Sequence, residues 1–250
     1  MEISADGSLD PDLPQIGDGS GYCITKADLS LVRLGSIHVS NWAAETAPLG
    51  LDEDFYAWVA SELAQALSAD GVDAEEVAVY LKGSSTAFFS GPHKRMPLTD
   101  DDLVDEFRSR TNRFPEDIEL SKIVGRLNAH WPVGAQRPTR PFFDSLYQFG
   151  IDPLKSDYDL ELRSTPMVKR CEERAGQTYD ELTDERFSHP KYRFVRKDVV
   201  VKVFRNLRLF EELASRVLRR EVTVALFDDD GPSPHSSDEF HPGWLVGPRP

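Results

Sequence analysis

Polar and apolar residues alternate strictly in the stretch KSDYDLELR, residues 155–163. Successive side chains of a strand point to opposite faces, so this pattern predicts a strand with Asp157, Asp159 and Glu161 on one face. Carboxylates about 6.5 Å apart on one face repel each other unless a cation lies between them. Two interpretations are open at this point: a half-exposed strand with a solvated acidic face, or a strand that carries oxygen ligands for a divalent cation.

Periodicity also predicts the elements around this strand. Apolar residues at four-residue spacing predict a helix over 51–70, and alternation predicts a strand near 77–81 that ends in Gly83, Ser84 and Ser85. Further helices are expected over 100–111, 117–131, 165–175 and 207–220, and further strands over 192–204 and 221–227. In the helix over 207–220, Leu209, Leu213 and Val217 lie on one side. Strands mixed with helices in this way predict an α/β (α+β) fold.

The domain organisation follows from shifts in composition. Residues 1–50 are expected to form a partly disordered N-terminal extension, and residues 51–227 one domain. The long polar stretch 92–141 is expected to be a helical insertion in that domain, because loops of this length without structure of their own are uncommon. Residues 228–250 are expected to form a turn-rich C-terminal arm.

Composition narrows the class of protein. Of the 250 residues 40 % are hydrophobic, enough for a core, and the net charge of −14 argues against a general nucleic-acid or membrane coat protein. The two cysteines and six histidines show no ligand spacing, and no GxSxG, Walker A or GxGxxG motif occurs. Because no long apolar run or basic leader is present, we expect a cytoplasmic protein without a membrane partner.

Positive charge is concentrated between residues 191 and 220, a segment that contains ten lysines and arginines but only three aspartates and glutamates. In a chain this acidic, such a segment is either a candidate anion-binding face or a solvated surface whose charges pair along the helix.

The stretches VYLKGSS and SDYDLEL together resemble the nucleotidyltransferase superfamily that includes DNA polymerase β. The resemblance implies a mixed sheet flanked by helices, in which Gly83, Ser84 and Ser85 hold the phosphates of a nucleoside triphosphate (NTP). It also implies that Asp157 and Asp159 are catalytic and bind two Mg²⁺ or Mn²⁺ ions. The implied reaction is transfer of a nucleotidyl group from the NTP to a hydroxyl acceptor, with release of pyrophosphate.

This family usually supplies a third carboxylate from a later strand, and the matching position here is Thr223. Asp198 is our preferred substitute, as a third catalytic residue at the start of the strand-like stretch DVVVKVF (198–204), with Glu221 and Glu161 as alternatives. Lys202 would share that strand face and contact a phosphate. Five arginines of the insertion are further candidates for phosphate contact: Arg108, Arg110, Arg113, Arg137 and Arg140.

The acceptor remains open between several hypotheses. The basic segment favours RNA such as tRNA, as in toxin-like relatives held in check by an antitoxin-like protein partner, whereas overall acidity favours a small molecule of the antibiotic type or a protein. A catalytically inactive nucleotidyltransferase fold, serving as a nucleotide-binding or protein-interaction module, is the alternative that a missing third carboxylate favours. An acidic interaction protein without any nucleotide site is the third interpretation.

Overall fold

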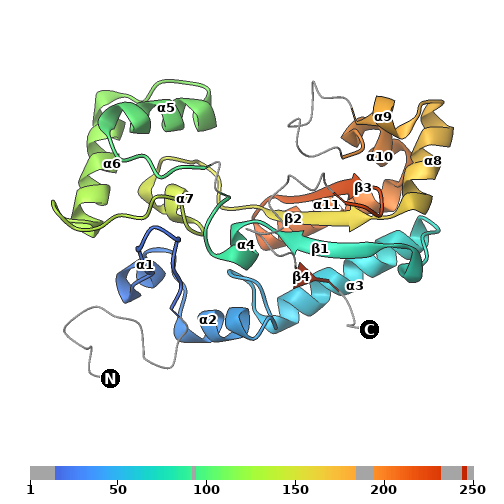
Figure 1. Ribbon diagram of the computed structural model, residues 1–250, viewed down its shortest axis with the longest axis horizontal. Coiled ribbons are helices and arrows are strands. Elements are labelled where there is room, and N and C mark those ends of the chain that lie inside the picture. The colour runs from blue at the N-terminus through green and yellow to red at the C-terminus, as the bar shows by residue number, and fades with distance from the viewer. Residues whose placement is uncertain (1–14, 92–93, 184–193, 232–243, 247–250) are drawn as a thin grey trace. The chain divides into compact units, whose positions relative to one another are not determined.

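The computed structural model describes residues 15–91, 94–183, 194–231 and 244–246. The fold is mixed α/β, as the sequence predicts, with helices flanking a four-stranded mixed sheet (Figure 1). The chain divides into two compact units: Met1–Asp52 with Ala87–Ser156, and Glu53–Thr86 with Asp157–Pro250. The insertion expected over 92–141 therefore falls within the first unit, together with N-terminal residues, while the arm expected over 228–250 lies mostly outside the described residues.

The second unit contains the sheet, whose strand order is β3-β2-β1-β4. Its strands are β1 (Ala78–Lys82), β2 (Tyr158–Arg163), β3 (Val222–Phe227) and β4 (Trp244–Leu245). β2 pairs antiparallel with β1 and parallel with β3, and β4 pairs antiparallel with β1. The strands expected near 77–81, in 155–163 and over 221–227 are confirmed.

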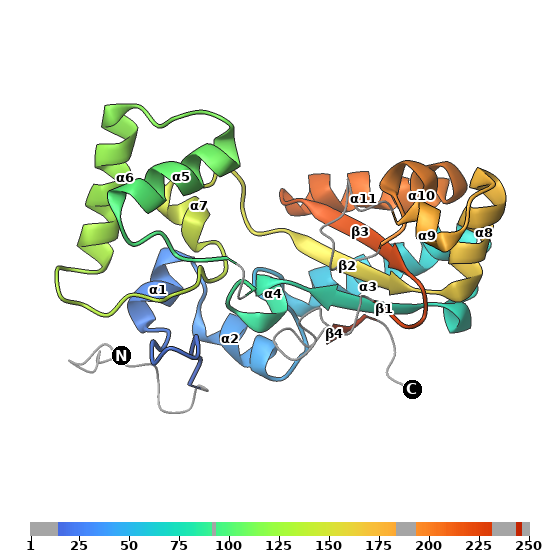
Figure 2. The ribbon, with the colours of Figure 1, turned by 45° about the horizontal axis from the view of Figure 1, so that its top comes forward.

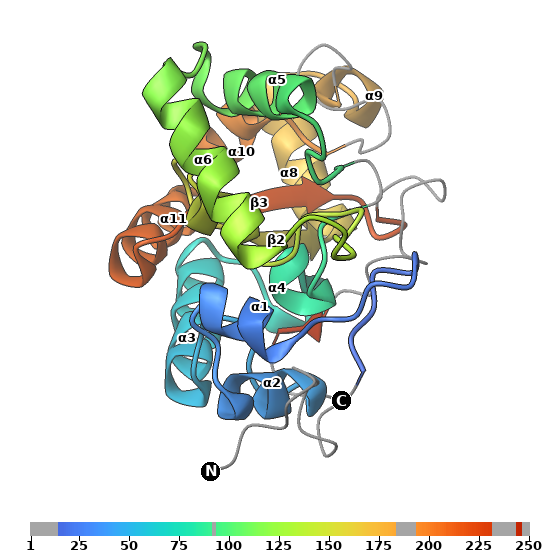
Figure 3. The ribbon, with the colours of Figure 1, turned by 90° about the vertical axis from the view of Figure 1, so that its left-hand side faces the viewer.

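The two faces of the sheet differ in polarity because of the alternation. Tyr158, Leu160 and Leu162 of β2 are buried on one face, where α3 (Glu53–Ala69) and α11 (Arg205–Leu218) cover the sheet (Figures 2 and 3). The other face carries the polar residues of the strands. Facing residues on neighbouring strands share a face, and the register therefore groups them into rows across the sheet.

Helix α11 is confirmed, but its buried side is not the side that four-residue spacing selects. Leu207, Phe210 and Ala214 are buried, while Leu209, Leu213 and Val217 are exposed. The carboxylate of Asp70, just after α3, accepts hydrogen bonds from the backbone N–H groups of Asn206 and Leu207 at 3.1 and 2.9 Å and so caps the start of α11. The remaining elements of this unit are η1 (Ala74–Glu76), α4 (Ser84–Ala87), α8 (Thr165–Ala175), α9 (Tyr179–Leu182) and α10 (Lys197–Val203).

The prediction of a strand over 192–204 is wrong, because the helix α10 occupies residues 197–203 of that stretch. The run of three valines has strand propensity, but tertiary packing overrides it. Val199 and Val200 are buried in the helical conformation, and Phe204 follows them fully buried at the start of α11.

The first unit is helical around an aromatic core. Its helices are α1 (Lys26–Leu31), α2 (Ser36–Ala43), α5 (Asp100–Thr111), α6 (Asp117–His130) and α7 (Ser145–Phe149). The helices expected over 100–111 and 117–131 are confirmed as α5 and α6. α5 begins at a capping box, in which the Thr99 side chain accepts from the Asp102 N–H and the Asp102 carboxylate accepts from the Thr99 N–H. The largest fully buried side chains include Phe88, Phe142 and Phe149.

Candidate functional site

The Gly-Ser turn lies directly against the second aspartate of the Asp-x-Asp pair. β1 and β2 are antiparallel with Lys82 opposite Asp159, so the end of β1 meets the start of β2. Gly83 has φ +89°, a conformation that glycine adopts without strain, and a Cβ on Gly83 would lie 3.4 Å from Asp159 Oδ2. The structure thus brings together the two motifs on which the resemblance rests.

The three hydroxyl residues after Gly83 differ in their hydrogen bonding. The Ser85 hydroxyl donates to the Lys82 carbonyl at 3.4 Å, and the Thr86 hydroxyl donates to the Gly83 carbonyl at 3.0 Å. Ser84 is only 9 % exposed, yet its hydroxyl has no hydrogen-bond partner in the described part of the chain. A buried polar group without a partner is destabilising and uncommon in native structures, so a water or a ligand is the expected partner of this hydroxyl.

Asp159 receives a hydrogen bond from the strand on its other side. β2 and β3 are parallel with Asp159 opposite Thr223, and the Thr223 hydroxyl donates to Asp159 Oδ1 at 2.6 Å. Asp157 directly precedes β2, and both aspartates are half-buried. The position that the resemblance assigns to a third carboxylate therefore holds a neutral hydroxyl that orients Asp159.

Glu161 lies one row further along the same face and is neutralised by two cations. Only 6 % exposed, it pairs with Arg163 at 2.5 Å and with Lys82 at 4.0 Å. The Arg163 guanidinium also lies 4.7 Å from the centre of the Tyr80 ring. These contacts hold Glu161 in an ion network beside the aspartates.

Asp198 and Lys202, expected at the site, lie together on α10 instead. The N–H of Val195 donates to the carbonyl of Leu226, three residues beyond Thr223, which places this segment at the other end of β3, about 10 Å along the strand (Figure 1). Asp198 is exposed and pairs with Arg196 at 3.1 Å and with Lys202 at 3.4 Å. Burial alone would raise the pKa of Asp198, but these hydrogen bonds outweigh it and lower the pKa.

Glu221, the other substitute, immediately precedes β3. Its carbonyl accepts from the Tyr158 N–H at 2.9 Å, but its side chain is exposed. Across the described ranges, no three side chains of His, Cys, Asp or Glu converge on a point where they could hold a metal ion.

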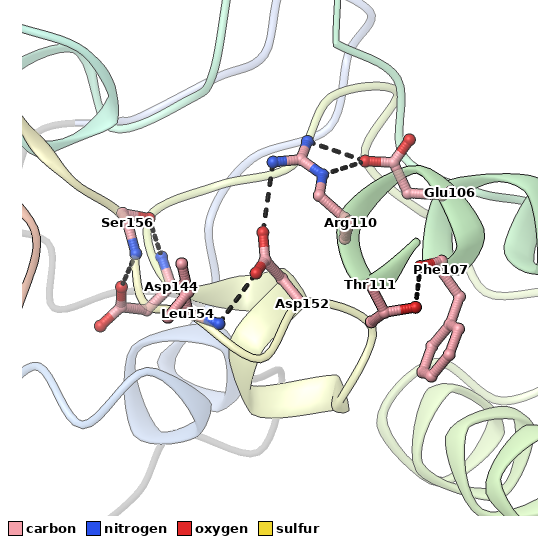
Figure 4. A network of polar contacts seen from close by, with 8 residues as sticks. All are labelled: Glu106, Phe107, Arg110, Thr111, Asp144, Asp152, Leu154 and Ser156. Atoms are coloured by element: carbon pink, nitrogen blue, oxygen red, sulfur yellow. Dashed lines mark hydrogen bonds and ion pairs between the residues drawn. The ribbon is translucent and has the colours of Figure 1, made fainter. Parts of the chain in front are cut away.

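The insertion arginines have partners within the first unit. Arg110 bridges Glu106 at 2.8 Å and Asp152 at 3.2 Å, and the neighbouring Asp144 and Ser156 exchange two hydrogen bonds (Figure 4). The other four are held by Phe114 (Arg108), Glu119 (Arg113), Asn128 (Arg137) and the Asp18 carbonyl (Arg140). These contacts give the arginines a structural role in the unit.

The basic segment is also largely paired. Besides Arg196 and Lys202 with Asp198, Lys197 pairs with Glu211 at 2.8 Å and Arg208 with Glu212 at 2.9 Å. Two further arginines of α11, Arg205 and Arg216, are exposed on its solvent side. The expectation of a solvated surface with local pairs thus describes much of this segment.

The donors at the end of β1 and β2 fit one hard divalent ion. Mg²⁺ is usually held by one or two carboxylates, with waters and substrate phosphates completing its shell, and Asp157 and Asp159 match that set. A second ion beside the first needs further carboxylates, and the facing positions on the neighbouring strands are Lys82 and Thr223. The residues therefore fit a single ion and do not fit a pair.

Comparison with known proteins finds no relative: no family model matches the chain, and neither a curated protein nor a solved structure is similar to it. The resemblance to nucleotidyltransferases consequently rests on the sequence motifs alone. In the part of the chain that the structure describes, no helix is both long and apolar enough to cross a bilayer.

Proposed function

We propose that the second unit binds an NTP with Mg²⁺ at the ends of β1 and β2, and that the chain is a nucleotidyltransferase. In this proposal Gly83 and Ser84 receive the terminal phosphates, and Asp157 and Asp159 hold the ion. The bound ion would neutralise phosphate charge and orient the α-phosphate toward the acceptor hydroxyl.

The observation that carries this proposal is the buried hydroxyl of Ser84. It belongs to the turn that lies against Asp159, and it has no hydrogen-bond partner among the described residues. A phosphate oxygen is a strong acceptor, and the glycine at position 83 lets a ligand approach the backbone closely. A solvated acidic strand would explain the aspartates but not this hydroxyl.

A thermal-stability measurement tests binding. Each NTP is added with and without Mg²⁺ to the wild type and to Asp157→Ala/Asp159→Ala. At 100 times the Kd, binding to the native state adds about 2.7 kcal/mol, which raises the Tm by about 5–10 °C for a chain of this size. We expect a rise that needs Mg²⁺ and is lost in the double variant.

The matched control is Glu75→Ala/Glu76→Ala, which removes two exposed carboxylates of the same unit. It should keep the nucleotide-dependent rise. No rise with any NTP in the wild type would contradict the proposal and favour an acidic interaction protein without a nucleotide site.

A second function, nucleotide binding without transfer, is favoured by Thr223. Its hydroxyl, in place of a carboxylate, faces Asp159 at 2.6 Å and adds no negative charge. Incubation with α-³²P-labelled NTPs separates the two functions: transfer releases labelled product and pyrophosphate, whereas a binding module gives the Tm rise alone.

The acceptor we propose to test first is RNA, with tRNA as the first sample. Arg205 and Arg216 of α11 are exposed, and neither has an ion-pair partner among the described residues. Label that transfers to RNA and falls in Arg205→Gln/Arg216→Gln would support it; label on added protein or hydroxyl-bearing small molecules would contradict it.

A further inference from the structure

Three large apolar side chains form an exposed line along α11, which we call the α11 stripe. Leu209, Leu213 and Val217 are 59 %, 41 % and 42 % exposed, and their four-residue spacing places them on one ridge of the helix. The helix packs into its own unit through its other side, where Leu207 and Phe210 are buried. Exposed apolar residues that stand singly are ordinary, but a continuous line with a polar rim is typical of a contact with another molecule.

Two exposed arginines flank the α11 stripe, and neither has an ion-pair partner among the described residues. At about 100° per residue, Arg205 and Arg216 lie within about 80° of Leu213 around the helix axis, on its exposed side. They are about 16 Å apart along the axis. Arg208 is also exposed but pairs with Glu212 at 2.9 Å. The face therefore combines apolar surface with two positive charges that no carboxylate of the described residues neutralises.

Polarity and charge together restrict the partner that suits this face. A nucleic-acid backbone pairs with arginines but gains little from leucine and valine side chains. A second copy of α11 on the same face would bring the arginines of both copies together, and like charges repel. A helix with carboxylates beside its apolar residues satisfies both features, because its apolar ridge packs against the α11 stripe while its carboxylates meet Arg205 and Arg216.

We infer that α11 is a docking surface for an acidic amphipathic helix of a partner protein. That helix carries apolar residues at four-residue spacing and carboxylates about 16 Å apart near the two ends of the apolar line. Ridges of this spacing pack at a crossing angle of about 50°, which confines the contact to the α11 stripe and its neighbours. The inference goes beyond the proposed function and does not involve the nucleotide site. It implies that the partner and RNA compete for Arg205 and Arg216.

A fluorescence-anisotropy titration with a synthetic helix tests this surface. The probe is a labelled peptide of about 18 residues, with leucine at every fourth position and glutamates beside that line. Because the chain has a net charge of −14, non-specific attraction of an acidic peptide is disfavoured. One helix covers a small interface, so we expect a Kd on the order of 10–100 μM. A control peptide with the same glutamates and serine in place of leucine should not bind.

Variants of both features should weaken binding of the acidic peptide. Leu213→Glu places a carboxylate at the centre of the α11 stripe and should raise the Kd about tenfold. Arg205→Gln/Arg216→Gln should raise it about fivefold. Leu154→Glu is the matched control, since it makes the same change at a leucine of the first unit that is 61 % exposed, and it should leave the Kd unchanged. If circular dichroism shows that Leu213→Glu does not fold, Leu209→Ser at the most exposed position of the stripe replaces it.

The outcomes decide between this partner and the others. No binding to the wild type, or an unchanged Kd in Leu213→Glu and Leu209→Ser, would overturn the inference. A loss confined to Arg205→Gln/Arg216→Gln would also overturn it, because a purely electrostatic face suits RNA.

Sedimentation equilibrium of the chain alone tests the remaining occupant. A dimer that Leu213→Glu dissociates would overturn the inference in favour of a second copy. Leu213→Glu should keep the NTP-dependent rise in Tm, because Leu213 has no part in the proposed nucleotide site. Failure of peptide binding and failure of nucleotide binding are therefore separate results.

Discussion

Two carboxylates, Asp28 in the first unit and Asp159 in the second, show how differently one chain uses the same side chain. Asp28 is fully buried and lies 2.6 Å from the Tyr22 hydroxyl, 2.7 Å from the Thr25 N–H and 2.7 Å from His130 Nε2. Asp159 is half-buried, accepts a hydrogen bond from Thr223, and lies beside the turn that carries Ser84, whose hydroxyl has no partner in the described ranges.

The difference lies in the burial and the hydrogen-bond donors around each carboxylate. Burial alone would raise the pKa of Asp28, but hydrogen bonds from His130, Tyr22 and Thr25 outweigh it and lower the pKa. Burial and the neighbouring Asp28 carboxylate in turn raise the pKa of the Tyr22 hydroxyl. A carboxylate surrounded by donors in this way stabilises the fold, whereas Asp159 is partly exposed and lies beside a turn whose Ser84 hydroxyl has no hydrogen-bond partner among the described residues.

The largest expected effect is at Asp28. Asp28→Ala removes the common acceptor of Tyr22, Thr25 and His130 from the interior, and we expect the free energy of unfolding to fall by about 3–5 kcal/mol. Urea denaturation followed by tryptophan fluorescence measures it, since the Trp131 Nε1–H donates to the Tyr22 hydroxyl at 3.0 Å. Asp157→Ala/Asp159→Ala should change stability by less than about 1 kcal/mol; equal losses in both variants would remove the distinction between the two regions.

The next largest effect is at Gly83. Gly83→Ala forces an alanine into φ +89° and brings its Cβ against Asp159, which should cost about 1–3 kcal/mol and abolish the NTP-dependent rise in Tm. Thermal unfolding with and without Mg²⁺ and NTP measures both effects. Gly125→Ala is the control: Gly125 lies within α6 with open space around it, so alanine should stabilise the helix. A Gly83→Ala protein that still responds to nucleotide would show that the turn does not hold phosphates.

The sequence predicted the strands of the candidate site because alternation is a local property. Asp157, Asp159 and the Gly-Ser turn could be placed from spacing, and antiparallel pairing brought them together as the resemblance implies. The helix α10 was missed because its valines favour a strand locally and only packing against the rest of the unit decides otherwise.

Local sequence patterns could not predict that Thr223, Asp159 and Lys82 lie opposite one another across the sheet. This arrangement depends on the register of three strands that are far apart in the chain, and a shift of one residue would turn each side chain to the opposite face. The absence of a hydrogen-bond partner for the Ser84 hydroxyl among the described residues likewise depends on what the fold places around it.

A pH titration tests a second buried carboxylate of the first unit, Asp18, for a contribution to stability. Burial alone would raise the pKa of Asp18, but hydrogen bonds from Ser20 and Thr139 lower it to about 2. Because the folded pKa lies below the unfolded value, this carboxylate stabilises the fold above about pH 4, and the contribution is lost as the pH falls toward about 2.

We expect this contribution to be on the order of 1–2 kcal/mol after solvent screening. Asp18→Asn should flatten the pH dependence of the free energy of unfolding in that window, measured by urea denaturation at each pH. An unchanged slope in Asp18→Asn would show that other carboxylates of the unit dominate its acid sensitivity.

The smallest expected change in stability is at Ser84, and whether that change is a gain or a loss is informative. Ser84→Ala removes a buried hydroxyl that has no protein partner among the described residues, so the free protein should keep its stability or gain up to about 1 kcal/mol. Ser85→Ala, one residue along, removes a hydroxyl that donates to the Lys82 carbonyl and should destabilise by about 1 kcal/mol. Calorimetric titration with Mg²⁺ and NTP should show Ser84→Ala binding about fivefold to tenfold more weakly. Unchanged or higher stability together with weaker NTP binding in Ser84→Ala would support a ligand-binding role for the Ser84 hydroxyl. Lower stability with unchanged affinity would instead indicate that Ser84 is an ordinary turn residue.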